Sequence, residues 1–174
     1  MDPRQTRGFL NNNPGNMDRG EPPWNGEIRD PARCINEVQR SELVHGRFCV
    51  FVDASHGIRA MVHNLWAYHD RLGCRSIRDY INRWAPPNEN NTTGYIARVA
   101  ASVGTDSDAE VDIHDRRIVG AVVNGIINVE CAGMPYDGEE IERGLALAGA
   151  RADKEKADEK VRTDPPAAVI DSTR

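Results

Sequence analysis

The sequence predicts a mainly α fold of the α+β class, with a compact helical domain, a short β element, an extended N-terminal arm and a charged C-terminal tail. Helix-period apolar patterns, one β-rich run, and turn formers or charges concentrated at the two ends support this prediction. The 174 residues suffice for one domain of about 100 to 150 residues with tails. We expect an arm or ordered loop at 1–33, a helical domain at 34–149 on which residues 8–33 pack, and a flexible tail at 150–174.

Turn-forming residues dominate the arm. Asn11–Asn16 read Asn-Asn-Asn-Pro-Gly-Asn and residues 22–26 read Pro-Pro-Trp-Asn-Gly, a density that excludes a long helix. Phe9 and Trp24 indicate that parts of the arm pack on an apolar surface.

The central part of the chain predicts helices and one strand. Residues 34–46 favour a short helix, and the Phe-Cys-Val-Phe-Val run at 48–52 favours a strand. Five longer segments carry apolar residues at helical spacing, and four of them follow a capping residue. They run from Ser55 to Leu72, from Ser76 to Ala85, from Thr92 or Thr93 to Val103, from about Asp115 to Glu130, and from the capping box of Asp137 and Glu140 to Ala148.

Composition limits the partners. A net charge of −5 argues against a nucleic-acid partner. No apolar run approaches the roughly 18 to 20 residues of a membrane span, and residues 1–7 lack the apolar stretch of a signal peptide. We therefore expect no membrane span and synthesis in the cytoplasm. The alternating charges of the tail are typical of a solvated segment or of a helix that forms on a partner.

Neither cysteines nor histidines form a metal motif. The four cysteines contain no Cys-x-x-Cys pair, and the five histidines form neither His-Glu-x-x-His nor an i, i+4 pair. No glycine loop for a nucleotide is present. We expect free buried thiols, no metal and no cofactor. Asp53, Ser55 and His56 are too close in sequence for a catalytic triad, so a capping role is favoured.

Glu130 is the strongest candidate for a catalytic residue. It continues the apolar stripe of the 115–130 helix, four residues after Ile126 and three after Ile127. Burial disfavours the charged form of a carboxyl group, and a carboxyl that keeps its proton near neutral pH can act as a general acid. The other interpretation is a glutamate that turns to solvent or pairs with an arginine.

A glycosidase usually needs a second carboxylate or a substrate-assisted route. Glu21, Glu27, Asp18 and Asp53 are the candidates, and the sequence does not choose among them.

The asparagine cluster also has two interpretations. Its amides can satisfy the backbone of their own turn, or they can line a sugar site together with the indole of Trp24. The candidate substrate-binding residues are Asn12, Asn13, Asn16, Trp24 and Tyr136.

Several motifs in order resemble a family of tailed-phage and prophage virion structural proteins, over about residues 8–149. They are the Asn11–Asn16 run, Trp24-x-Gly26, Phe48-x-Val50-Phe51 with Gly57-Ile58-Arg59-Ala60-Met61, and Arg83-Trp84-Ala85-Pro86-Pro87 with Glu89-Asn90-x-Thr92 and Tyr95. This resemblance implies a phage protein located in the virion and made in the host cytoplasm.

The order of the Asn-rich loop, Trp-x-Gly, a Phe-containing strand and a Tyr-bearing helix is also similar to the part of flagellar-type glucosaminidases that follows their catalytic Glu. Those enzymes have a lysozyme-like fold and cut peptidoglycan. The resemblance implies a circular permutation that puts Glu130 in the position of the catalytic acid, although Cys131-Ala132 and an apparent insertion at 34–47 depart from the pattern.

The favoured hypothesis is a virion-associated protein with a lysozyme-like domain that acts on peptidoglycan glycan strands, as a glycosidase or lytic transglycosylase. The alternative is a non-catalytic capsid or tail protein that binds other virion proteins through its arm and tail. A small effector that inhibits a host protein is a third possibility. A buried acid open to a cleft favours the enzyme, whereas an acid paired with arginine and covered by a partner favours the structural protein.

Overall fold

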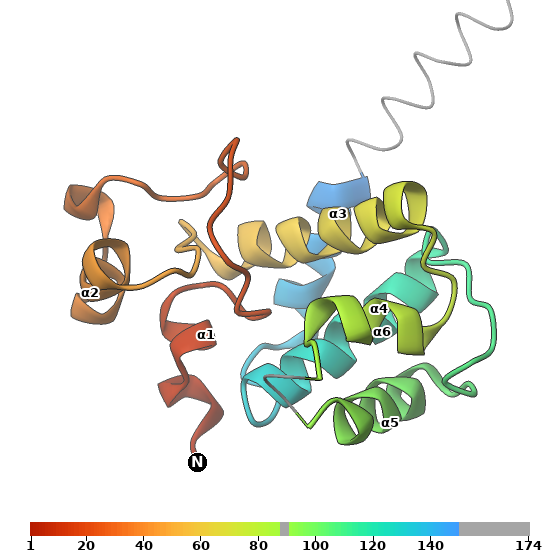
Figure 1. Ribbon diagram of the computed structural model, residues 1–174. Helices are drawn as coiled ribbons and strands as arrows, with labels where there is room; N and C mark the ends of the chain where they lie inside the picture. Colours follow the sequence, from red (N-terminus) through yellow and green to blue (C-terminus); the bar gives the residue numbers. More distant parts are fainter. Residues whose placement is uncertain (88–90, 150–174) are drawn as a thin grey trace, which may run out of the picture.

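A computed structural model describes residues 1–87 and 91–149 of the chain. Figure 1 shows α1 and α2 on one side of the molecule and α3 to α6 on the other. The mainly helical prediction is confirmed. The elements are η1 (Pro3–Gln5), α1 (Arg7–Leu10), η2 (Pro31–Arg33), α2 (Glu37–His45), α3 (Ala54–Leu72), α4 (Ile77–Trp84), α5 (Thr92–Val103) and α6 (Arg116–Glu130), followed by a helical segment at residues 138–149.

The helix α6 supplies much of the core. Val122, Ile126 and Ile127 on its apolar stripe are completely buried, and each such aliphatic side chain contributes about 1.5 to 3 kcal/mol of burial energy. Gly125 lets α5 approach closely, because a Cβ at this position would lie 3.1 Å from Cα of Val99. The stripe therefore fixes the end of α6 against its neighbours.

The helix ends follow from local capping chemistry. The Asp53 side chain, rather than that of Ser55, caps α3 by accepting a hydrogen bond from His56 N, and Gly73 ends this helix in the left-handed region at φ 72°. Ser76 caps α4 as expected, in a reciprocal capping box with Asp79. Helices predicted from their own periodicity thus begin within two residues of the expected positions.

The prediction of a strand at 48–52 is wrong. Within the described ranges this segment forms only isolated antiparallel bridges, Asp18 with Phe48 and Glu27 with Phe51. The reason is that its backbone meets separate parts of the arm: Cys49 N donates to the carbonyl of Met17, and Phe51 N to that of Asn11. A ladder needs one continuous partner strand, which the turn-rich arm does not provide.

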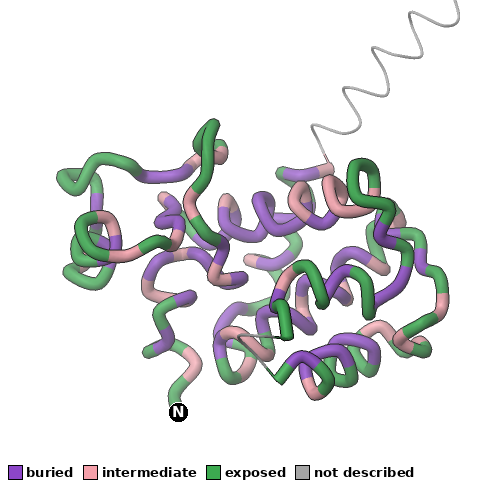
Figure 2. Tube along the Cα trace, in the orientation of Figure 1, coloured by how far each residue is buried: buried purple, intermediate pink, exposed green. Residues whose placement is uncertain are grey.

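The Asn-rich loop is packed onto the start of α3. Figure 2 shows a long buried stretch in α3, short buried runs in α6 and buried positions in the N-terminal part of the chain. Asn11 and Asn13 are fully buried. Gly57 permits this contact, because a Cβ there would lie 2.1 Å from the backbone oxygen of Asn12.

In the described part of the chain, no helix is long and apolar enough to cross a membrane. The charged tail predicted at 150–174 lies outside the described residues, and so do Glu89 and Asn90 of the motif that begins at Arg83.

Candidate functional site

A cleft of about 670 Å³ lies between the arm and the helices α3 and α4. The arm contributes Asn16, Asp18, Glu21 and Trp24, among others, and α6 contributes Glu130 at its last turn. Side chains from α3 and α4 form the opposite side, and they are Asn64, Tyr68, Arg83 and Trp84. The cleft therefore brings an acid, amides, aromatic rings and charged groups from distant parts of the chain together.

Both oxygens of the Glu130 carboxyl group are held by hydrogen bonds. Asn16 Nδ2 donates to Oε2 at 2.8 Å, and the Tyr95 hydroxyl donates to Oε1 at 2.8 Å. Asn16 has φ 47°, a left-handed conformation that asparagine tolerates better than most residues. Residues of the Asn-rich loop, α5 and α6 thus meet at one partly buried carboxyl group.

The two hydrogen-bond donors are neutral groups. Burial, and then the neighbouring Glu130, raise the pKa of Tyr95 above its ordinary value. The phenol therefore keeps its proton and donates a hydrogen bond to the carboxyl group. A carboxyl group has about four lone-pair sites, of which these bonds use two. A carboxyl group held in this way has a fixed orientation at the edge of the cleft.

Glu130 also borders a second hollow of about 310 Å³, which Asn91, Tyr95 and Arg98 help to line. Glu130 thus borders both hollows.

Aromatic and cationic groups lie together in the cleft. The guanidinium carbon of Arg7 lies 3.8 Å from the ring centroid of Phe48, and that of Arg47 lies 4.9 Å from the same centroid. Such stacking holds guanidinium groups in place at little cost in solvation. Trp24 and Trp84 add indole surface to the lining.

The structure brings three of the predicted site residues together and places three elsewhere. Glu130, Asn16 and Trp24 all line the cleft, whereas the lining, as far as the chain is described, includes none of Asn12, Asn13 and Tyr136.

The side chains of these three residues contact the loop backbone or the core instead of the cleft. Asn12 Nδ2 donates to the carbonyl of Phe51. Asn13 Nδ2 donates to the carbonyls of Met17 and Cys49, and its Oδ1 accepts a hydrogen bond from Met17 N. Tyr136 is buried, with its ring centroid 5.4 Å from that of Phe9. Within the asparagine cluster, the amides of Asn12 and Asn13 thus hold the loop, and that of Asn16 reaches the acid.

The four candidate second carboxylates separate in the same way. Glu27 is buried, accepts a hydrogen bond from Trp24 N at 2.9 Å and forms an ion pair with Arg29. Asp53 caps α3. Asp18 and Glu21 line the cleft with Glu130.

Sequence reasoning missed Tyr95 as a site residue. Its position on the buried stripe of α5 predicts a core residue, and its ring is indeed buried. Only the packing of α5 on α6 shows that its hydroxyl reaches Glu130, 35 positions away.

Fold and site define a small, mainly helical protein in which a carboxyl at the end of a core helix borders a cleft. No model of a known protein family matches the chain. Protein P5 of Pseudoalteromonas phage PM2 is 33% identical to it over 142 residues, covering 80% of this chain and 79% of that protein. The chain belongs to the family of this phage protein, and the expected relation to phage proteins is confirmed.

Proposed function

We propose that this chain is a virion-associated phage protein, made in the host cytoplasm, whose cleft binds and cuts the glycan strands of peptidoglycan. One observation carries the proposal: Glu130 lies in a cleft with both carboxyl oxygens held by neutral donors, not covered by an arginine ion pair among the described residues. The arrangement would be lysozyme-like, with an acid at the end of a core helix facing sugars. Kinship with a phage protein supports the phage setting.

The residues of the cleft suit an N-acetylated, acidic glycan. Glu130 would protonate the oxygen of the glycosidic bond as the bond breaks. The indoles of Trp24 and Trp84 offer flat apolar surface for sugar faces. Arg7 and Arg83 would attract the carboxylates that peptidoglycan carries.

The second step of the reaction has two candidate carboxylates. Asp18 and Glu21 line the cleft from the arm and would act as base or nucleophile. A substrate-assisted route or intramolecular attack within the sugar would need neither of them, and then only Glu130 would be essential.

The test measures soluble fragments released from purified peptidoglycan, separated and weighed by mass spectrometry. The wild-type protein should release muropeptides, and Glu130→Gln, which keeps the shape but removes the proton donor, should lower the rate by about 100-fold or more. Glu139→Gln is the matched control, because Glu139 is an exposed acid outside the cleft lining. It should retain wild-type activity.

Equal rates for wild type and Glu130→Gln would refute the role of Glu130. No release by the folded wild-type protein would refute the glycosidase proposal. The masses of the products also separate hydrolysis from lytic transglycosylation, since the latter leaves an anhydro sugar end.

A specific observation favours the structural alternative as a second candidate. Ile35 is 76% exposed and Val44 is 63% exposed, both at the α2 side of the molecule, and exposed aliphatic residues of this kind suit contact with another virion protein. A Val44→Lys variant should then enter particles poorly while it keeps glycan cleavage. Normal incorporation would refute this contact.

A further inference from the structure

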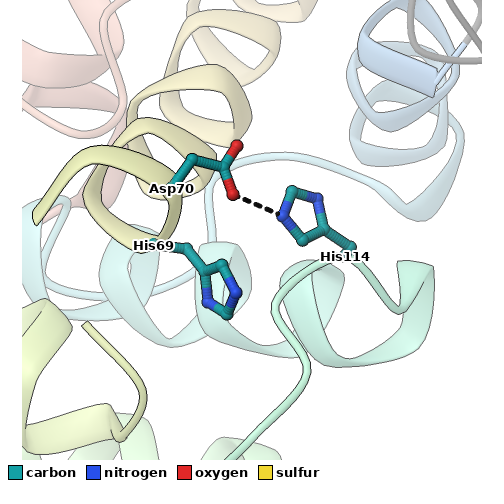
Figure 3. A group of neighbouring side chains, drawn as sticks. All are labelled: His69, Asp70 and His114. Carbon is teal, nitrogen blue, oxygen red and sulfur yellow. Dashed lines mark hydrogen bonds and ion pairs between the residues drawn. The ribbon is translucent and has the colours of Figure 1, made fainter. Parts of the chain in front are cut away.

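Two histidines and an aspartate converge outside the cleft. His69 and Asp70 lie in the last turn of α3, and His114 lies in the segment before α6. Figure 3 shows the two imidazole rings and the carboxylate drawn together from these two elements. One potential ligand atom from each residue lies within 4.8 Å of the others, and His114 Nε2 is 3.0 Å from Asp70 Oδ1.

The hydrogen bonds of His69 leave one ring nitrogen available. The Tyr80 hydroxyl donates its single proton to the carbonyl of Cys74 at 3.0 Å. His69 Nδ1, 2.9 Å from the same hydroxyl oxygen, must therefore be the donor in their contact. In the neutral ring the lone pair then lies on Nε2. A hydrogen bond from the other ring nitrogen is the usual way in which proteins orient a metal-binding histidine.

His114 is also held in place by its surroundings. Its ring stacks on Trp66, with centroids 5.6 Å apart and planes at 28°. Trp66 Nε1 donates to the carbonyl of Ile113, and His114 N donates to Asp112 Oδ1. The ring is thus supported on one face, while its residue remains exposed to solvent.

The donor set indicates a class of ion. Neutral imidazole and carboxylate together suit Zn²⁺ and similar first-row transition metals, whereas Mg²⁺ and Ca²⁺ prefer sets of oxygen atoms. Ligand atoms in a tetrahedral zinc site are about 3.3 Å apart, so separations of up to 4.8 Å need only small side-chain rotations. Because Asp70 and His114 are exposed, water can complete the coordination shell.

We propose that His69, Asp70 and His114 form a binding site for a divalent transition metal, with Zn²⁺ as the expected ion. The bound ion would tie the end of α3 to the segment that leads into α6. The absence of a short metal-binding motif led to the prediction of no metal site. This cluster instead joins Asp70 and His114, which are 44 positions apart in the sequence. The proposal does not depend on the glycan-cleaving activity.

The test titrates ZnCl₂ into the full-length protein after removal of metal by a chelator, with calorimetry for stoichiometry and thermal unfolding as a second readout. The wild-type protein should bind one Zn²⁺ per chain with a Kd below about 10 μM and unfold at a higher temperature when saturated. Asp70→Asn and His114→Ala should each weaken binding by at least 10-fold. Mg²⁺ at the same concentration should produce no shift.

His45→Ala is the matched control, because His45 is exposed on α2 and outside the cluster. It should bind Zn²⁺ like the wild type. Co²⁺ as a probe should give the intense visible absorption of a four-coordinate site, and His114→Ala should abolish it. The proposal is overturned if the folded wild-type protein binds Zn²⁺ with a Kd above about 10 μM or does not bind it. It is equally overturned if Asp70→Asn and His114→Ala bind as tightly as the wild type.

Discussion

The contact of the Asn-rich loop with α3 predicts a large effect of a single methyl group at Gly57. A Cβ at this position would lie 2.1 Å from the backbone oxygen of Asn12 and 2.9 Å from Cδ of Pro14. Side-chain rotation cannot relieve the clash with a backbone atom, so the loop must move. Overpacking of this kind costs up to about 3 kcal/mol, and alanine regains about 1 kcal/mol through its better helix propensity.

Gly57→Ala should therefore lower the free energy of unfolding by about 2 kcal/mol, which for a chain of this size corresponds to a fall in Tm of about 4 to 8 °C. Thermal unfolding followed by circular dichroism measures this change. Gly138→Ala is the control, because a Cβ at Gly138 meets no atom within 4 Å, and its effect should stay within about 0.5 kcal/mol. A Gly57→Ala protein as stable as the wild type would refute the described packing of the loop on α3.

Two further predictions concern the hydroxyl beside the acid and the buried thiols. Tyr95→Phe removes the donor to Glu130 Oε1 and should slow muropeptide release by about 5- to 30-fold, because about 1 to 2 kcal/mol of positioning is lost. Tyr136→Phe is the control and should not slow release, because the Tyr136 hydroxyl has no partner among the described residues. Equal effects of the two substitutions would contradict the positioning role of Tyr95. Burial raises the pKa of Cys49 to about 12 and that of Cys131 to about 11, so at pH 8 a thiol reagent should react with the four free cysteines only after unfolding in guanidinium chloride. Rapid reaction of the native protein would contradict this burial.

The helices were predictable because their signals are local. Ser76, Asp115 and Gly104 mark helix ends through contacts within one turn, and the apolar period identifies the buried face. The structure of the segment at 48–52 was not predictable, because a β-rich run becomes a strand only if a continuous partner strand lies beside it. That condition depends on the path of the arm, which its sequence of turns does not specify.

The candidate site divides along the same line. Glu130 could be found from the stripe of a single helix. The sequence could not show which of Asn12, Asn13 and Asn16 reaches the acid. The backbone angles at each position decide whether its amide holds the loop or bonds to Glu130. The role of Tyr95 likewise depends on helix packing, since the sequence of a buried apolar stripe does not show which group accepts the hydrogen bond of its tyrosine hydroxyl.

The central claim is that the cleft presents a glycosidic bond to the carboxyl group of Glu130. A crystal structure of the Glu130→Gln protein with a peptidoglycan tetrasaccharide tests this claim most directly. The sugars should occupy the cleft beside Trp24 and Trp84, with one glycosidic oxygen within about 3 Å of the side-chain amide at position 130. An empty cleft at saturating tetrasaccharide, or sugars bound elsewhere on the protein, would contradict the claim.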